Sequence, residues 1–149
     1  RMMEVEERIA VLCQGKDREA YKAMRELQAE SLRSAEAAPY MDTFLAMLGS
    51  QNSYVRTRGL VLAAANARWD AENKLDGALE EYLAHIGDEK PITARQCVKA
   101  LPAIAEAKPY LAPRIRQALL NANTAQYPDS MATLLEKDIA AALNAMSGL

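Results

Sequence analysis

The sequence contains few of the residues that build small reactive or cross-linked sites: one His, two Cys, six Gly and eight aromatic residues among 149. This composition disfavours a disulfide scaffold and a zinc site, since both need several Cys or His residues close together. Cys13 and Cys97 lie far apart, and neither has the lone His85 as a neighbour, so we expect two reduced thiols. No GxGxxG, Walker, GxSxG or HExxH pattern is present, so we expect no catalytic residue, no metal and no cofactor.

An excess of positive charge is also lacking, because 18 basic residues face 20 acidic ones and the net charge is -2. A general nucleic-acid coat or an anionic-membrane binder usually carries a surplus of Lys and Arg. Residues 1–8 include three acids and no apolar core, unlike a signal peptide. We therefore expect a cytoplasmic protein with no membrane segment.

Helix-forming residues dominate what is present. Ala and Leu together number 47, whereas the β-branched Ile, Val and Thr number 16. Ala and Leu favour helices and β-branched residues favour strands. The length suits one domain, so we predict an all-α domain over residues 1–149.

An apolar pattern repeats along the chain at an offset of 37 residues. Its first copy is Ala20, Ala23, Met24 and Leu27, and the later copies are Thr57, Leu60, Val61 and Ala64, then Ala94, Cys97, Val98 and Leu101, then Met131, Leu134, Leu135 and Asp138. All but Asp138 are small or apolar, and their i, i+3, i+4, i+7 spacing predicts one buried helix stripe per copy. The adjacent columns, such as Tyr21 with Arg58 and Arg25 with Lys99, are mainly polar and are expected on the outer side of the same helices.

A second helix is expected in each copy, over residues 41–48, 75–86 and 111–122. Gly49 and Gly87 follow the first two, where a helix commonly stops. The predicted repeats are 17–50, 51–88 and 89–123, with capping helices over 2–13 and 130–146 (a C-terminal cap within 129–147). Pro102 lies inside the run 92–107, so we expect it either to bend one helix near Val98 or to separate two short helices.

Residues 54–63 (YVRTRGLVLA) and 92–102 (ITARQCVKALP) resemble the first helices of HEAT repeats, including the proline of a bent first helix. The resemblance covers about residues 17–123. The chain is also similar to small uncharacterised bacterial HEAT-like proteins over 82–102. The resemblance departs at Tyr21, where later copies have Arg, and the customary Asp of the intra-repeat turn is clear only at Asp70. It implies a short right-handed α-solenoid of about three helix pairs, whose second helices line a concave surface that binds other macromolecules.

The expected function is a non-catalytic protein-interaction or scaffold module for a protein or peptide partner. The expected contacts lie on the second helices, opposite their apolar stripes: Thr43, Met47, Glu80, Glu81, Ala84, Arg116, Gln117 and Leu120. The sequence leaves the identity of the partner and the oligomeric state open.

Two other functions are weighed against this one. A line of Arg56, Arg58, Arg95 and Lys99 is the basis of the alternative, a nucleic-acid module like the HEAT-like DNA glycosylases; ion pairs between repeats are the favoured role of these residues. Carboxylate chemistry at Glu80 and Glu81 is disfavoured, because adjacent helix residues point about 100° apart. We therefore expect neither nucleic-acid binding nor enzymatic activity.

Overall fold

The computed structural model describes residues 3–149, and within that range it is all-helical, with no strand. The α-helices are α1 (Val5–Gln14), α2 (Asp17–Ser31), α3 (Met41–Met47), α4 (Ser53–Ala65), α5 (Lys74–Gly77), α6 (Leu79–Ala84), α7 (Pro91–Ala107), α8 (Ala112–Leu120) and α9 (Asp129–Ala145). The predicted all-α class is confirmed. Of the described residues, no helix combines the length and the apolar character needed to cross a membrane.

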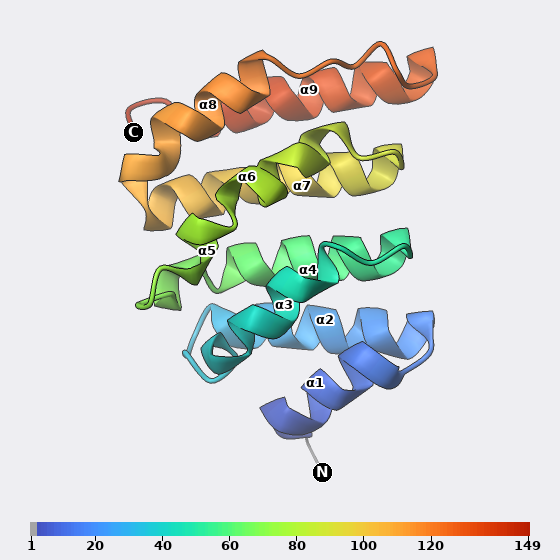
Figure 1. The fold of residues 1–149 in the computed structure, drawn as a ribbon, viewed down its shortest axis with the longest axis vertical. Helices are drawn as coiled ribbons and strands as arrows, with labels where there is room; N and C mark the ends of the chain where they lie inside the picture. Colours follow the sequence, from blue (N-terminus) through green and yellow to red (C-terminus); the bar gives the residue numbers. More distant parts are fainter. Residues whose placement is uncertain (1–2) are drawn as a thin grey trace.

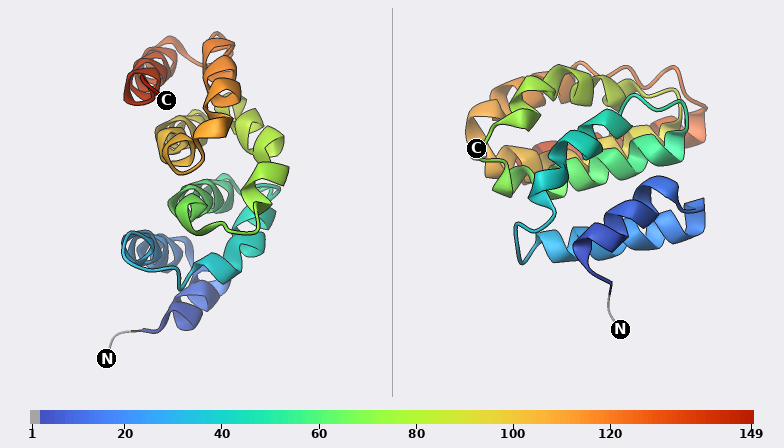
Figure 2. Two further views of the ribbon diagram at one scale, coloured as in Figure 1. Left: turned by 90° about the vertical axis from the view of Figure 1, so that its left-hand side faces the viewer. Right: turned by 60° about the horizontal axis from the view of Figure 1, so that its bottom comes forward.

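The helices are arranged in two layers (Figure 1). Helices α2, α4, α7 and α9 lie side by side, and α4 contacts both α2 and α7. Helices α3, α5, α6 and α8 cover one side of this row, with α1 at its N-terminal end (Figure 2). In the left view of Figure 2 both layers bow, so that the row of α2, α4, α7 and α9 lies on the inner side of the curve.

Most expected helices occur close to their predicted bounds. The helix expected over 130–146 is α9, and that over 41–48 is α3. The helix expected over 2–13 is α1, although residue 2 lies outside the described residues. The prediction of a single helix over 75–86 is wrong, because α5 ends at Gly77 and Ala78 separates it from α6. The alternative that Pro102 separates two short helices is also wrong, because α7 continues through that residue.

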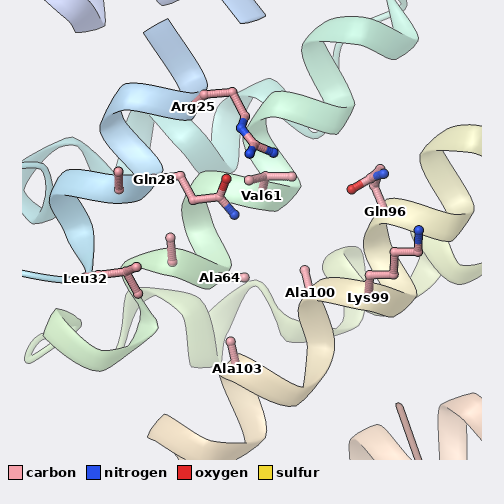
Figure 3. A pocket seen from close by; sticks show the side chains of 11 residues that line it. Arg25, Gln28, Leu32, Val61, Ala64, Gln96, Lys99, Ala100 and Ala103 are labelled. Carbon is pink, nitrogen blue, oxygen red and sulfur yellow. The ribbon is translucent and has the colours of Figure 1, made fainter. Parts of the chain in front are cut away.

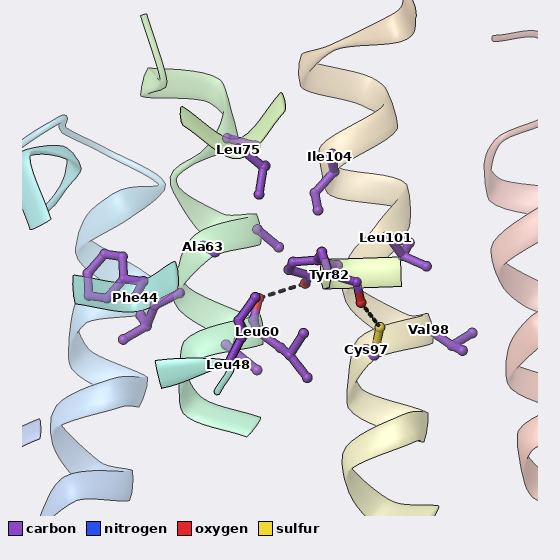
Figure 4. Packing of buried hydrophobic residues seen from close by; sticks show 14 of the residues in the cluster. Phe44, Leu48, Leu60, Ala63, Leu75, Tyr82, Cys97, Val98, Leu101 and Ile104 are labelled. Atoms are coloured by element: carbon purple, nitrogen blue, oxygen red, sulfur yellow. Dashed lines mark hydrogen bonds between the residues drawn. The ribbon is translucent and has the colours of Figure 1, made fainter. Parts of the chain in front are cut away.

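The core lies between the two layers and contains the repeated apolar stripes. The stripe residues of α2 and α7 are all buried, whereas in α9 Leu134 is exposed. Tyr82 from α6 reaches into the row and donates a 2.7 Å hydrogen bond from its hydroxyl to the Leu60 carbonyl (Figure 4). The Cys97 thiol donates to the Tyr82 carbonyl at 3.5 Å. Both cysteines are free, as expected, and burial raises the pKa of Cys97.

Buried ion pairs connect successive helices of the row. Arg56 of α4 donates from Nε and Nη2 to Asp88, just before α7, at 2.9 and 2.8 Å. The same carboxylate accepts from the Lys90 backbone N–H at 2.9 Å, and its Oδ2 lies 2.8 Å from His85 Nδ1. Asp88 therefore holds the ends of α4 and α7 together.

A second buried ion pair joins the C-terminal end of α7 to the turn after α4. The Lys108 ammonium lies 2.8 Å from Asp76 Oδ1 and 3.3 Å from Asp70 Oδ2. It also donates to Asn73 Oδ1 at 2.9 Å. Lys108 thus joins the turn between α4 and α5 to the end of α7.

Close contact between α3 and α4 depends on Gly59. A Cβ at this position would lie 2.7 Å from the Phe44 carbonyl oxygen and 2.8 Å from Met47 Cβ. We expect Gly59→Ala to lower the free energy of unfolding by about 1–3 kcal/mol in urea denaturation, because α3 must shift. Gly77→Ala is the matched control, since its Cβ meets nothing within 4 Å. An equal effect of the two substitutions would contradict close α3–α4 packing as the cause.

Candidate functional site

Two adjoining hollows lie on the row of α2, α4 and α7. One, of about 490 Å³, is lined by Arg25, Gln28, Ala29, Leu32, Val61, Ala64, Ala65, Gln96, Lys99, Ala100 and Ala103. The other, of about 1010 Å³, is lined by Asp17, Arg18, Tyr21, Met24, Arg25, Gln28, Ser53, Tyr54, Thr57, Arg58, Val61, Lys90, Pro91, Ile92, Thr93 and Gln96. Because they share Arg25, Gln28, Val61 and Gln96, we treat them as one site, the central groove.

The floor of the central groove is apolar because α4 presents small side chains there. Val61 and Ala64 belong to the repeated stripe of α4 and are almost completely buried between α2 and α7. These short side chains leave space between the longer side chains of α2 and α7. The floor therefore offers a shallow apolar surface.

Long polar side chains form the two rims. Arg25 and Gln28 extend from α2, and Gln96 and Lys99 extend from α7, on opposite sides of the space above Val61 (Figure 3). Arginine and lysine only donate hydrogen bonds, whereas the glutamine amides both donate and accept. The rims can therefore bind carboxylates, phosphates or backbone carbonyls.

Exposed apolar side chains extend this surface at both ends. Tyr21, Tyr54 and Ile92 line the larger hollow and Leu32 lines the smaller one, and each is more than half exposed. A cluster of exposed apolar side chains beside a hollow is typical of a protein or ligand interface. These four residues therefore favour a macromolecular ligand that covers the groove.

The groove is basic although the chain as a whole is slightly acidic. Its lining contains the cations Arg18, Arg25, Arg58, Lys90 and Lys99 and a single carboxylate, Asp17. Among the described residues, no carboxylate lies within 4.0 Å of any of these cations except Asp17, near Arg58. The local charge therefore attracts an acidic ligand.

Arg58 is the most unusual of these cations because it is buried and poorly paired. Its side chain is only 6% exposed, and its closest carboxylate oxygen, Asp17 Oδ1, lies 3.5 Å from Nη1. The buried Nε has no hydrogen-bond partner within residues 3–149. Because Nε is itself buried, an anionic oxygen in the larger hollow can reach Arg58 only through the part of the guanidinium that lines that hollow.

The residues expected to contact a partner lie outside this groove. Neither hollow is lined by any of Thr43, Met47, Glu80, Glu81, Ala84, Arg116, Gln117 or Leu120, which belong to α3, α6 and α8. The expectation that the second helices line the hollowed side is therefore wrong. The physical reason is the direction in which the two layers bow: the row of α2, α4, α7 and α9 lies on the inner side of the curve, and the second helices lie on the outer side (Figure 2).

Several of these residues have structural partners. Met47 is buried, so its expected position on a binding face is wrong. Glu80 pairs with Arg114 at 2.6 Å, and this pairing lowers the pKa of Glu80. Arg116 donates to the carbonyls of Met146 and Leu149 near the C-terminal end. Thr43 is half-buried, while Glu81, Ala84, Gln117 and Leu120 are exposed, and a contact of these exposed side chains with a partner stays a prediction.

The predicted basic line is divided between structure and groove. Arg56 is buried on Asp88, and Arg95 pairs with Asp138 of α9 at 2.6 Å, as expected for ion pairs between successive helices. Arg58 and Lys99 line the groove instead. Two of the four residues therefore have the ion-pair role that was favoured for them, and nucleic-acid binding by Arg58 and Lys99 stays a prediction.

Sequence reasoning did not identify the remaining rim residues, above all Arg18, Gln28, Lys90 and Gln96. A usable signal existed in the polar columns of the 37-residue pattern, where Tyr21 aligns with Arg58 and Arg25 aligns with Lys99. These four aligned residues line the groove, whereas the remaining members of the two columns do not: Arg95 pairs with Asp138 and Leu62 is buried.

Within residues 3–149, no group of three or more His, Cys, Asp or Glu side chains is placed to hold a metal ion. The chain gives no match to protein-family models, to curated proteins or to solved structures.

Proposed function

We propose that this chain is a non-catalytic protein-interaction module, a short right-handed HEAT-like α-solenoid that binds a segment of a partner protein in the central groove. The row of α2, α4, α7 and α9 supports this architecture, because these helices carry the 37-residue pattern and lie side by side. Repeated helix pairs of this kind hold an extended binding surface rigid.

The observation that carries the proposal is an apolar floor flanked by polar rims. An amphipathic helix or extended peptide lays its apolar side chains on such a floor and uses its polar ones on the rims. Tyr21, Tyr54, Ile92 and Leu32 would lose their exposed apolar surface in that complex. Such burial contributes roughly 25 cal/mol for each Å² removed from water.

A second candidate, nucleic-acid binding, is favoured by the cation excess alone. Arg18, Arg25, Lys90 and Lys99 could contact phosphates, and binding would then fall steeply as salt rises. The alanine-rich part of the floor has no role in contacting a phosphodiester backbone. For this reason the protein segment is the better supported ligand.

The test compares two exposed helical alanines, one on each face. Ala103 lines the groove, whereas Ala84 lies on α6 among the second-helix residues first expected to bind. Tagged wild-type protein, Ala103→Glu and Ala84→Glu are used to capture proteins from lysate of the source cells, with and without nuclease treatment in parallel. We expect a stoichiometric partner with wild-type protein and Ala84→Glu, and about a tenfold loss or more with Ala103→Glu, since a charged bulk then occupies the floor.

Unchanged helicity by circular dichroism serves as the folding control for both variants. Loss of the partner with Ala84→Glu alone would move the binding site to the second helices. Retention that disappears after nuclease treatment would instead favour the nucleic-acid candidate.

A further inference from the structure

We propose that the segment bound in the central groove is an acidic amphipathic helix, one of whose carboxylates pairs with Arg58. This inference rests on the proposed function and adds the chemistry of the partner. It follows from three independent features of the groove: its unpaired cations, its buried arginine and its small-residue floor.

The first feature is the absence of internal carboxylates for the rim cations. Elsewhere in the chain, the buried or half-buried cations Arg56, Arg95 and Lys108 have carboxylates at 2.6–2.9 Å, and buried Arg8 has one at 3.4 Å, whereas the rim cations Arg25 and Lys99 are exposed. Among the described residues, Arg25 of α2 and Lys99 of α7 have none within 4.0 Å, although both face the same hollow. Carboxylates on a bound segment would supply the missing charge from outside.

The second feature is the state of Arg58. The Arg58 side chain is only 6% exposed, and the carboxylate nearest to it among the described residues, Asp17, lies 3.5 Å from Nη1 and is itself 57% exposed, so the guanidinium charge is weakly paired. A carboxylate with two oxygens matches the parallel N–H groups of a guanidinium. Arg58 therefore favours a ligand that places a carboxylate at the inner wall of the larger hollow.

The third feature separates a helix from a nucleic acid. Ala29, Ala64, Ala65, Ala100 and Ala103 line the smaller hollow together with Val61 and Leu32. Small residues let another helix approach closely, and its apolar side chains at i, i+3, i+4 and i+7 can then reach the floor. The combination of apolar floor and basic rims complements a helix with an apolar stripe flanked by Asp and Glu.

The experiment begins with selection from a displayed library of 18-residue peptides with a fixed apolar stripe at i, i+4, i+7 and i+11 and randomised remaining positions. Wild-type protein is the bait at physiological salt. We expect the enriched peptides to gain Asp and Glu beside the stripe. The best peptide is synthesised together with a version in which every Glu is Gln and every Asp is Asn, and we expect the neutral version to bind about tenfold more weakly or worse.

Variants of the protein then locate the contact. Arg58→Met keeps a long apolar stem without the guanidinium and should weaken the acidic peptide about tenfold or more. Lys99→Glu reverses an exposed rim charge and should weaken it about threefold to tenfold, even if Arg58→Met folds poorly. The matched control is Lys22→Glu, an exposed residue of α2 that lines neither hollow, and we expect unchanged affinity.

Each other outcome identifies what is wrong. Groove-dependent peptides without acidic enrichment would overturn the acidic helix and leave the proposed function intact. The selected acidic peptides could also bind all three groove variants (Ala103→Glu, Arg58→Met and Lys99→Glu) with the same affinity as wild-type protein. That result would overturn the groove as the binding site, and with it the proposed function. A 20-nucleotide RNA or DNA could bind wild-type protein more tightly than any selected peptide and not bind the Lys99→Glu variant. That result would overturn this proposal in favour of nucleic acid.

Discussion

Replacing Asp88 by alanine should lower the free energy of unfolding by about 3–5 kcal/mol, since it leaves a buried arginine without its partner. The Asp88 carboxylate is 3% exposed and the Arg56 guanidinium facing it is 8% exposed. The substitution also removes the acceptor of the Lys90 backbone N–H and the partner of His85. The ends of α4 and α7 then lose the carboxylate that joins them.

Urea denaturation followed by circular dichroism measures this effect, and Glu89→Ala is its matched control. Glu89 is the next residue and lies 3.9 Å from the same guanidinium, but its side chain is 76% exposed. Exposed pairs contribute about 0–1 kcal/mol, so the control should change stability by no more than that. Similar losses in both variants would show that burial of the Asp88 pair is not the cause.

The pH dependence of stability provides a second measurement of the same carboxylate. Burial alone raises the pKa of Asp88, but hydrogen bonds from Arg56, from the Lys90 backbone and from His85 outweigh it and hold the pKa below its ordinary value. A lowered pKa contributes stability that is fully present above the unfolded value of about 3.9. That contribution is lost as the pH falls through the lower native pKa. The free energy of unfolding of Asp88→Ala should therefore fall less steeply with decreasing pH than that of wild-type protein.

Lys108→Met is expected to have an effect of similar size, a loss of about 3–5 kcal/mol, because it leaves the buried Asp70 carboxylate without a counter-charge. Burial lowers the pKa of Lys108, but hydrogen bonding to Asp76 and the charge of Asp70 outweigh it and raise the pKa above its ordinary value. The ammonium is therefore fully charged at neutral pH. Methionine retains the apolar stem, so the loss reports the charge and its hydrogen bonds.

The control for Lys108 is Lys74→Met. The Lys74 ammonium lies 2.9 Å from Asp42 Oδ2, a shorter distance than from Lys108 to Asp70, but the Asp42 side chain is 77% exposed. We expect little change in the free energy of unfolding in the same denaturation experiment, because solvent screens an exposed pair. If Lys74→Met cost as much as Lys108→Met, the buried position of Lys108 would not explain the loss.

The sequence predicted the helices well where an apolar stripe had the helical period. Helix α9 begins and ends within one residue of its expected bounds. Its predicted stripe was only partly right, because Leu135 is buried, Leu134 is exposed and Asp138 pairs with Arg95. The second helix of the middle repeat was predicted as one piece because Leu75 and Leu79 continue the stripe. The backbone nevertheless breaks at Ala78, a local conformation that side-chain periodicity does not encode.

The candidate site was much harder to predict than the helices. Arg56 and Arg58 are two positions apart and chemically identical, yet one is bound to Asp88 and the other lines the groove. The difference depends on a carboxylate 32 residues away, which helical periodicity cannot supply. The concave side was assigned to the second helices because the resemblance to HEAT repeats implies that arrangement. The direction in which the layers bow depends on packing between neighbouring helices, which helical periodicity does not encode.

The hydrogen bonds and ion pairs that join neighbouring helices have a consequence for how the chain folds. Arg56 to Asp88 spans 32 residues, Asn66 to Ser31 spans 35, and Arg95 to Asp138 spans 43. Chains whose contacts are close in sequence fold faster than chains that must first close long loops. Each helix of the row can therefore gain its main partner once about forty further residues have left the ribosome, so the order of synthesis is also an efficient order of folding.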